Sequence, residues 1–144
     1  MKKQNDLDIP GVMDWLNQEV WDLTRHMAFT ALNVMQAETR VRYGRARASW
    51  GMGSPTARNR DPGERGPENA ISPSEATALA MQSVSNVTRQ VPAGGPKRIE
   101  VASYVDYMIY LDQGTDYIEP GHMVDKGARA AAEDFGRYTG GIFQ

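Results

Sequence analysis

The chain has 144 residues, no cysteine, and 40% hydrophobic and 24% charged residues. These values are typical of a globular chain that forms one domain around one modest core. The absence of cysteine excludes disulfides, thiolate catalysis and cysteine zinc sites, and it is consistent with folding in a reducing cytosol. A formal net charge of −2 gives the whole chain no attraction for phosphate, so nucleic-acid contact would need a local basic patch. No apolar run approaches the ~20 residues that span a bilayer, and no apolar stretch follows the N-terminal lysines, so neither a membrane span nor a signal peptide is expected.

The N-terminal third predicts one long amphipathic helix. Residues 1–9 are polar and are expected to be a flexible lead-in. Pro10 is tolerated in a first helical turn, and apolar residues then recur at three- and four-residue steps to about Glu38. The side chains of this stripe that we expect in the core include Leu16, Val20 and Met27.

The period changes after this helix. Between Arg45 and Trp50 charged or polar side chains alternate with apolar ones, which predicts a strand with its arginines outward and its alanines and Trp50 in the core. The segment 51–71 is rich in Gly, Pro, Arg and Asn, so we expect a long loop or arm that is mobile in the free monomer.

The remaining segments predict three further helices and a strand. A helix over 72–91 begins with Ser72 as N-cap and Glu75 as its capping-box partner, and 92–96 form a turn. The alternating segment 97–104 predicts a second strand.

The C-terminal segments complete the expected core. A short helix ends at Gly114 and presents Tyr107 and Leu111 inward, and the last helix covers 122–136. The inward residues predicted on that last helix are Met123, Val124, Gly127, Ala131 and Phe135, and residues 137–144 show no period. Residues 1–144 are therefore predicted to form a single α+β domain, in which a long N-terminal helix and a C-terminal helix pack on a small β-sheet.

Residues suited to catalysis or metal binding are few. The two histidines, His26 and His122, have no carboxylate pair at a metal-ligand spacing, and no nucleophile elbow or phosphate loop is present. The carboxylates of the C-terminal half are expected to form a solvated or interface surface. We therefore expect no enzymatic activity, no metal and no cofactor.

Charge is unevenly distributed along the chain. The central arginines are Arg40, Arg42, Arg45, Arg47, Arg58, Arg60 and Arg65, and the acidic residues of the C-terminal half include Asp112, Asp116 and Glu119. The basic segment can face phosphate, or it can meet the acidic surface of the next subunit in a head-to-tail contact, which builds a ring when its rotation closes. Because alternation places Trp50 opposite the arginines, the sequence favours subunit contact over a nucleic-acid stacking surface.

Three short patterns resemble the tailed-phage head–tail joining and tail-completion proteins, the group that includes lambda-type minor tail protein Z. "YGRARASW" after the long helix is similar to that family's Thr-Gly-x-Leu-x-x-Ser segment. "YMIYLDQGT" is similar to its Tyr-Ala-x-x-Leu-Glu-x-Gly-Thr, with Met108 and Asp112 as departures. "PGHMVDKGARAAAEDF" resembles its closing Pro-x-Gly-Met-Val helix.

This resemblance implies a structural virion protein that forms a homo-oligomeric ring in the phage neck after assembly in the host cytoplasm. The implied partners are other copies of the chain, portal-side or adaptor neck proteins, and tail tube or tail terminator proteins, with non-specific contact to channel DNA and none to a membrane. The alternative is a small DNA-binding accessory protein that uses the basic segment Arg40–Arg65.

Overall fold

The computed structural model describes residues 8–143, with side-chain placements through Thr139. The elements are α1 (Ile9–Glu38), α2 (Arg45–Ala48), β1 (Trp50–Gly53), α3 (Pro73–Met81), the 3₁₀ helix η1 (Gln82–Asn86), β2 (Glu100–Ser103), α4 (Met108–Gln113) and α5 (Met123–Phe143). Helices therefore combine with a two-stranded antiparallel sheet, and the predicted α+β class is confirmed. No helix of the described residues is long and apolar enough to cross a membrane.

Helix α1 begins almost where the sequence predicts. The Asp8 side chain accepts a hydrogen bond from the Gly11 amide at 3.2 Å and so acts as N-cap, and Pro10 lies in the first turn. Ile9 is already helical, which shortens the expected lead-in, and residues 1–7 of that lead-in lie outside the described residues.

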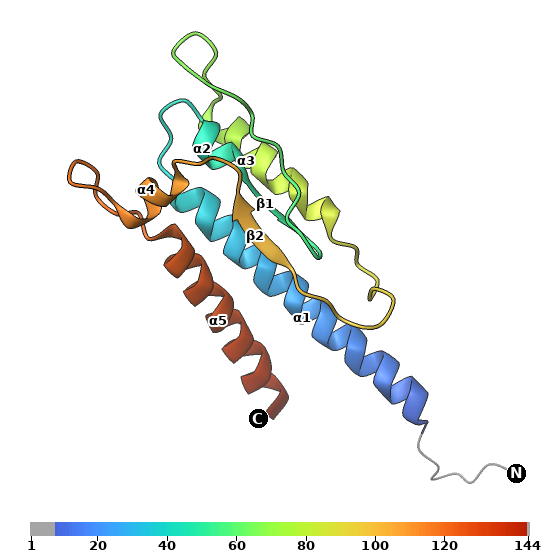
Figure 1. The fold of residues 1–144 in the computed structure, drawn as a ribbon. Helices are drawn as coiled ribbons and strands as arrows, with labels where there is room; N and C mark the ends of the chain where they lie inside the picture. The colour runs from blue at the N-terminus through green and yellow to red at the C-terminus, as the bar shows by residue number, and fades with distance from the viewer. Residues whose placement is uncertain (1–7, 144) are drawn as a thin grey trace, which may run out of the picture.

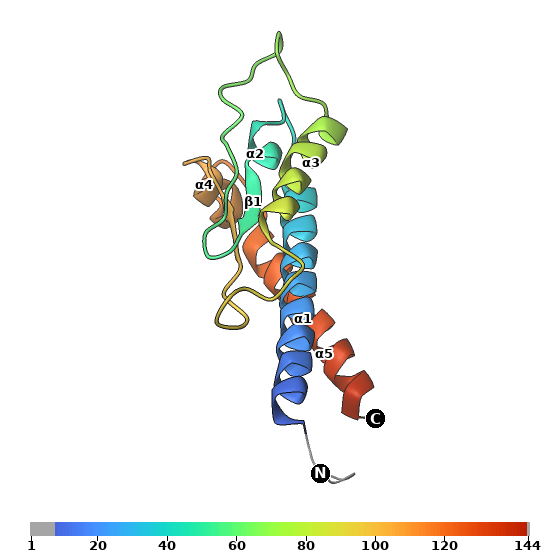
Figure 2. The same ribbon diagram turned by 90° about the vertical axis from the view of Figure 1, so that its right-hand side faces the viewer.

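The body of the molecule is built along α1. Helix α5 runs back beside it in both views, while the sheet, α2 and α3 lie along the same C-terminal half of α1 (Figures 1 and 2). Gly127 allows the close approach of the two long helices, because a Cβ there would lie 2.6 Å from Met35 atoms and 3.1 Å from the Ala31 carbonyl oxygen. The small residue predicted at this contact therefore has a packing role.

The predicted strand over 45–50 is wrong for most of its length. Residues 45–48 form one helical turn, in which the Ala48 amide donates to the Gly44 carbonyl at 3.0 Å, and the strand begins only at Trp50. A short apolar alternation cannot separate one tight turn from a strand when its inward residues are alanines, which fit either. The expected inward residues Ala46, Ala48 and Trp50 are nevertheless buried. Strand β1 pairs with β2 from Trp50 opposite Ser103 to Gly53 opposite Glu100.

The core is centred on two tryptophans. Trp21 is fully buried and its indole N–H donates to the Thr88 carbonyl at 3.0 Å. Trp50 is 2% exposed and donates to the Thr39 hydroxyl at 2.7 Å. Burial of Trp50 and Met123 is thus confirmed. The half-buried members of the predicted core are Met27, Tyr107 and Leu111.

Two residues of the predicted core are exposed in this chain. Leu16 is 43% and Val20 is 45% exposed, so their assignment to the core is wrong. The cause is visible in Figure 1, where the N-terminal half of α1 extends past the sheet and α3. Val124 and Phe135, which were also expected to face inward, are each 49% exposed on α5. Met123 and Gly127 of that helix are buried as expected, and Asp134 is the third buried residue on its inward side.

The segment predicted as an arm begins as strand β1 and then runs along the body. Asn59 donates to the Ala48 carbonyl at 2.9 Å, and Ala57 is 3% exposed. The Ile71 amide donates to the Tyr43 carbonyl at 2.8 Å, and this bond holds the C-terminal end of the segment on the body. These contacts hold both ends of the segment on the body, while its mobility stays a prediction.

Two helix ends differ from the predicted ones. The Ser72 cap is confirmed, since its hydroxyl accepts from the Glu75 amide, but the α-helix ends at Met81 and a 3₁₀ turn follows. The Ser83 and Ser85 hydroxyls there donate to carbonyls three residues back, a local bond that competes with the helical ladder. At the other end of the chain, the segment without a period continues α5 to Phe143.

Candidate interaction surfaces

Arg45 fastens the arm to the body. Its guanidinium donates two hydrogen bonds to Asp61, at 2.9 and 2.6 Å, and lies 5.5 Å from the centre of the Tyr107 ring. The bonded guanidinium holds the pKa of Asp61 below its usual value, and the same contact raises the pKa of Arg45. Within the chain Arg45 thus has a structural role, and its subunit-facing or channel-facing role stays a prediction.

Arg47 closes the C-terminal end of α1. It donates to the Ala37 carbonyl at 3.0 Å and to the Thr39 carbonyl at 3.1 and 3.3 Å. The last carbonyls of a helix have no partner within the helix, and a cation there is also favoured by the helix dipole. Arg47 is thus half-buried in a structural role, in place of the outward position predicted.

Arg40 and Arg42 remain exposed, as predicted. Arg40 reaches the Glu119 carbonyl oxygen at 3.4 Å, and Arg42 lies 5.0 Å from the centre of the Tyr43 ring. Both arginines help line a groove of about 590 Å³ that also contains Arg45 and Arg65.

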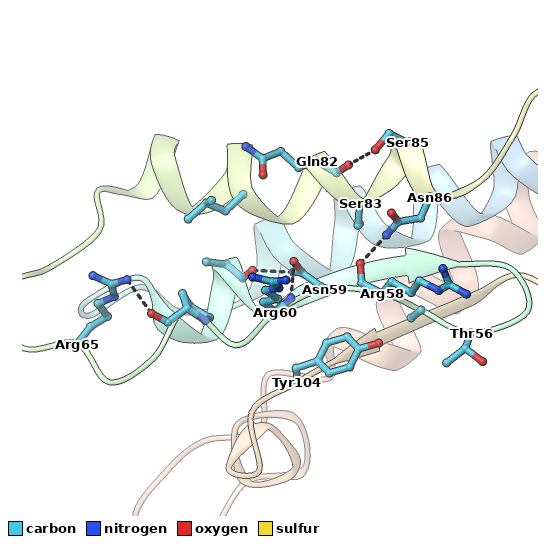
Figure 3. A pocket seen from close by; sticks show the side chains of 14 residues that line it. Thr56, Arg58, Asn59, Arg60, Arg65, Gln82, Ser83, Ser85, Asn86 and Tyr104 are labelled. Carbon is cyan, nitrogen blue, oxygen red and sulfur yellow. Dashed lines mark hydrogen bonds between the residues drawn. The ribbon is translucent and has the colours of Figure 1, made fainter.

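Arg58 and Arg60 lie on a larger groove between the arm and η1. This groove has a volume of about 1090 Å³ and is lined by three arginines, Arg58, Arg60 and Arg65, with Ser, Asn, Gln and Tyr side chains (Figure 3). No carboxylate is among the described residues that line it. Within residues 8–139, the side chains of Arg58 and Arg60 form no ion pair and donate no hydrogen bond. They are exposed positive charges without an internal partner, which agrees with their predicted exposure.

The three predicted acidic residues do not act alike. Asp112 accepts a hydrogen bond from the Val124 amide at 3.0 Å, and its carbonyl accepts from His122, so it caps the start of α5. Asp116 and Glu119 are exposed on the loop between α4 and α5. These bonds give Asp112 a structural role within the chain, and its place at a subunit interface or channel stays a prediction.

The histidines lie at structural positions. His26 is 3.3 Å from the buried Asp134 carboxylate, across the contact between α1 and α5. The Thr30 hydroxyl, Arg137 and His26 hold the pKa of Asp134 below its usual value. Throughout the part of the chain that the structure describes, no group of three or more His, Asp or Glu side chains could hold a metal ion.

An exposed apolar face on α1 was missed as a candidate site. It comprises Ile9, Val12, Met13, Leu16 and Val20, which are 42–55% exposed. Up to Val20, the charged residues of α1 are Asp14, on the opposite side of the helix, and Glu19, at the edge of the stripe seven residues after Val12. The signal was present in the apolar periodicity, which we interpreted as a core face.

Comparison with protein-family models, with curated proteins and with solved structures finds no match. The class of this protein is therefore defined by its fold alone: an α+β domain whose long N-terminal helix extends beyond its body.

Proposed function

We propose that this protein is a structural virion component that assembles into a homo-oligomeric ring in a phage neck and joins the head to the tail. Its partners would be copies of itself, portal-side neck proteins, and tail tube or tail terminator proteins. Assembly in the host cytoplasm would precede its incorporation into the virion. The proposal includes no enzymatic activity and no cofactor.

The observation that carries the proposal is the apolar face of α1, formed by Ile9, Val12, Met13, Leu16 and Val20. With about half of each side chain exposed, this face is on the order of 400 Å², and patches of that size are often functional. Burying it against another copy would remove the apolar area from water, and the carboxylate at its edge, Glu19, already accepts a hydrogen bond from the Tyr138 hydroxyl. The face is thus typical of a chain that buries part of its apolar surface only when it forms an oligomer.

The segments that resemble the head–tail joining proteins are packed together. Arg45 of the first segment lies over Tyr107 of the second. Asp112 of the second bonds the Val124 amide of the third. Asp112 itself departs from the family pattern, so the support for the proposal is the packing of the three segments into one fold.

Mass photometry and negative-stain imaging of the purified protein, with and without virion partners, test this proposal. We expect rings, and we expect the protein to be present in purified virions. A strict monomer under all of these conditions, or absence from virions, would contradict it.

A second candidate function is supported by the carboxylate-free groove with Arg58 and Arg60. In this candidate the arginines of the groove bind the phosphates of DNA. The protein would do so either as part of a neck channel or as a separate accessory protein. Removing two phosphate contacts would weaken binding and lower the slope of log affinity against log salt by about two. A mobility-shift series on the variant with Arg58→Ala and Arg60→Ala tests this, with Arg129→Ala as control, and unchanged affinity would exclude the groove as a DNA site.

A further inference from the structure

The groove that contains Arg58 and Arg60 is suited to an anionic occupant. Its arm side carries these arginines, and its other side carries uncharged Gln82, Ser85 and Asn86 (Figure 3). Leu79 and Pro62 add apolar surface to the lining. A ligand that suits this groove combines carboxylates or phosphates with a flat apolar group.

The loop between α4 and α5 presents such a combination. Tyr117 is 97% exposed, and Asp116 and Glu119 are exposed beside it. No ion pair is formed by either acid among the described residues. A nearly fully exposed tyrosine flanked by two unpaired carboxylates has the chemistry of an interface anchor.

Internal hydrogen bonds hold this loop in shape. The Thr115 hydroxyl accepts from the amides of Tyr117 and Ile118, at 3.2 and 3.1 Å. The Gly121 amide donates to the Leu111 carbonyl at 2.8 Å, which closes the base of the loop. Because the loop is already ordered, docking it would cost little conformational entropy.

The loop and the groove lie on opposite sides of the molecule. In Figure 1 the loop projects on the left beyond α4, while the arm and α3 are on the right. A contact between two different surfaces on opposite sides is heterologous, and it produces a ring when its rotation closes. A loop of one chain in the groove of the next chain would be a contact of this kind.

We propose that the Tyr117 loop of one copy docks into the arginine groove of the next copy, with Asp116 and Glu119 facing Arg58 and Arg60. This inference rests on the proposed function, because it names the contact that would link neighbouring subunits of the ring. The Tyr117 ring packs on an arginine plane and on the apolar lining. The occupant is thus a second copy of this chain, selected by opposite charge and by an aromatic anchor.

Charge reversal in the full chain tests this pairing. One variant carries Arg58→Glu and Arg60→Glu, and the other carries Asp116→Lys and Glu119→Lys. Each reversal should weaken self-association roughly tenfold or more, and Tyr117→Ala should weaken it about 30-fold, as for an interface hot spot. Mixing the two reversed chains should restore assemblies in which the two chains alternate, because each then offers a loop opposite in charge to the other's groove.

Mass photometry over a concentration series gives the readout, and circular dichroism with thermal melting establishes that each variant folds. Arg98→Glu with Arg129→Glu is the control, since it makes the same change of charge outside the groove and the loop.

If wild type assembles but either reversal leaves assembly intact, or the mixture does not restore it, the pairing is wrong while the proposed function stands. If the groove reversal abolishes only salt-dependent DNA binding, the groove is a nucleic-acid site and the pairing is also wrong. A wild-type chain that stays monomeric at every concentration and with virion partners overturns the proposed function itself.

Discussion

The two halves of α1 carry the same apolar periodicity, but the apolar face is buried in one half and exposed in the other. In the C-terminal half, Ala31 and Met35 of this stripe are each 7% exposed and form part of the core. In the N-terminal half, Leu16 and Val20 are more than 40% exposed although they continue the stripe. An amphipathic stripe therefore predicts that a face will be buried, but it does not predict which chain buries it.

The difference between the halves comes from what lies beside them. The sheet, α2 and α3 cover only the C-terminal half of α1, and α5 follows the helix along one side (Figures 1 and 2). The N-terminal half keeps a helical backbone because its N-cap and proline favour it locally. Its apolar face nevertheless has no partner among the described residues, and we propose that another subunit supplies one.

The largest effect is expected for two tryptophans of α1 that differ in burial. Trp21→Ala removes a fully buried indole and its bond to the Thr88 carbonyl, and it should lower the free energy of unfolding by about 3–5 kcal/mol. Trp15→Ala, at a side chain that is 63% exposed, should change it by less than about 0.5 kcal/mol in the monomer. Urea unfolding of dilute protein measures both values, and equal losses would contradict the different burial of the two side chains.

A smaller effect of opposite sign is expected for two glycines of α5. Gly127→Ala adds a methyl group against Met35 and the Ala31 carbonyl, and it should destabilise the monomer by about 1 kcal/mol after its gain in helix propensity. Gly136→Ala meets nothing within 4 Å and should stabilise by up to about 1 kcal/mol. Thermal melting distinguishes the two, and stabilisation by both substitutions would mean that α5 does not approach α1 closely at Gly127.

A weaker contribution to the same helix contact depends on pH. The Thr30 hydroxyl, Arg137 and His26 lower the pKa of Asp134 in the folded chain, so the folded state binds a proton there less readily than the unfolded state. The resulting stability is complete above the unfolded pKa of about 4 and is lost as the pH falls through the lower folded value. Asp134→Asn should therefore be less stable at pH 7 and lose less stability below pH 4, as urea unfolding at several pH values would show. An equal acid loss in wild type and variant would contradict this.

The smallest effect on the monomer is expected from charges on the exposed face of α1. Leu16→Lys with Val20→Lys should change the free energy of unfolding of the dilute chain by less than about 0.5 kcal/mol each, because both side chains are already half in water. The same variant should not form rings in mass photometry. Arg98→Glu with Arg129→Glu is again the control, and intact rings in the lysine variant would remove the apolar face from the interface.

Local chemistry explains why much of the fold was predictable from sequence. The first turn of α1, the Ser72 cap of α3 and the end of α4 at Gly114 depend on residues within one turn of the chain. Gly114 has a φ of +81°, a conformation that favours glycine. Helix ends of this kind can be predicted because all the residues that determine them are close together in the sequence.

The errors arose where distant contacts decide the outcome. The turn at 45–48 is held by partners that include Asp61 and the end of α1, and no local pattern reveals them. The last turns of α5 lack an apolar period, yet the Tyr138 hydroxyl donates to Glu19 on α1. The candidate site was predicted only as a charge asymmetry, because sequence could not separate internally bonded Arg45 and Arg47 from unpaired Arg58 and Arg60.

Burial of the N-terminal half of α1 by another subunit is the central claim, and hydroxyl-radical footprinting of methionines tests it directly. In the dilute monomer Met13, which is 48% exposed, should be oxidised much faster than Met35 or Met123, which are 7% and 1% exposed. In purified rings Met13 should become protected while the two buried methionines remain unchanged. Oxidation of Met13 at the monomer rate within intact rings would contradict the account.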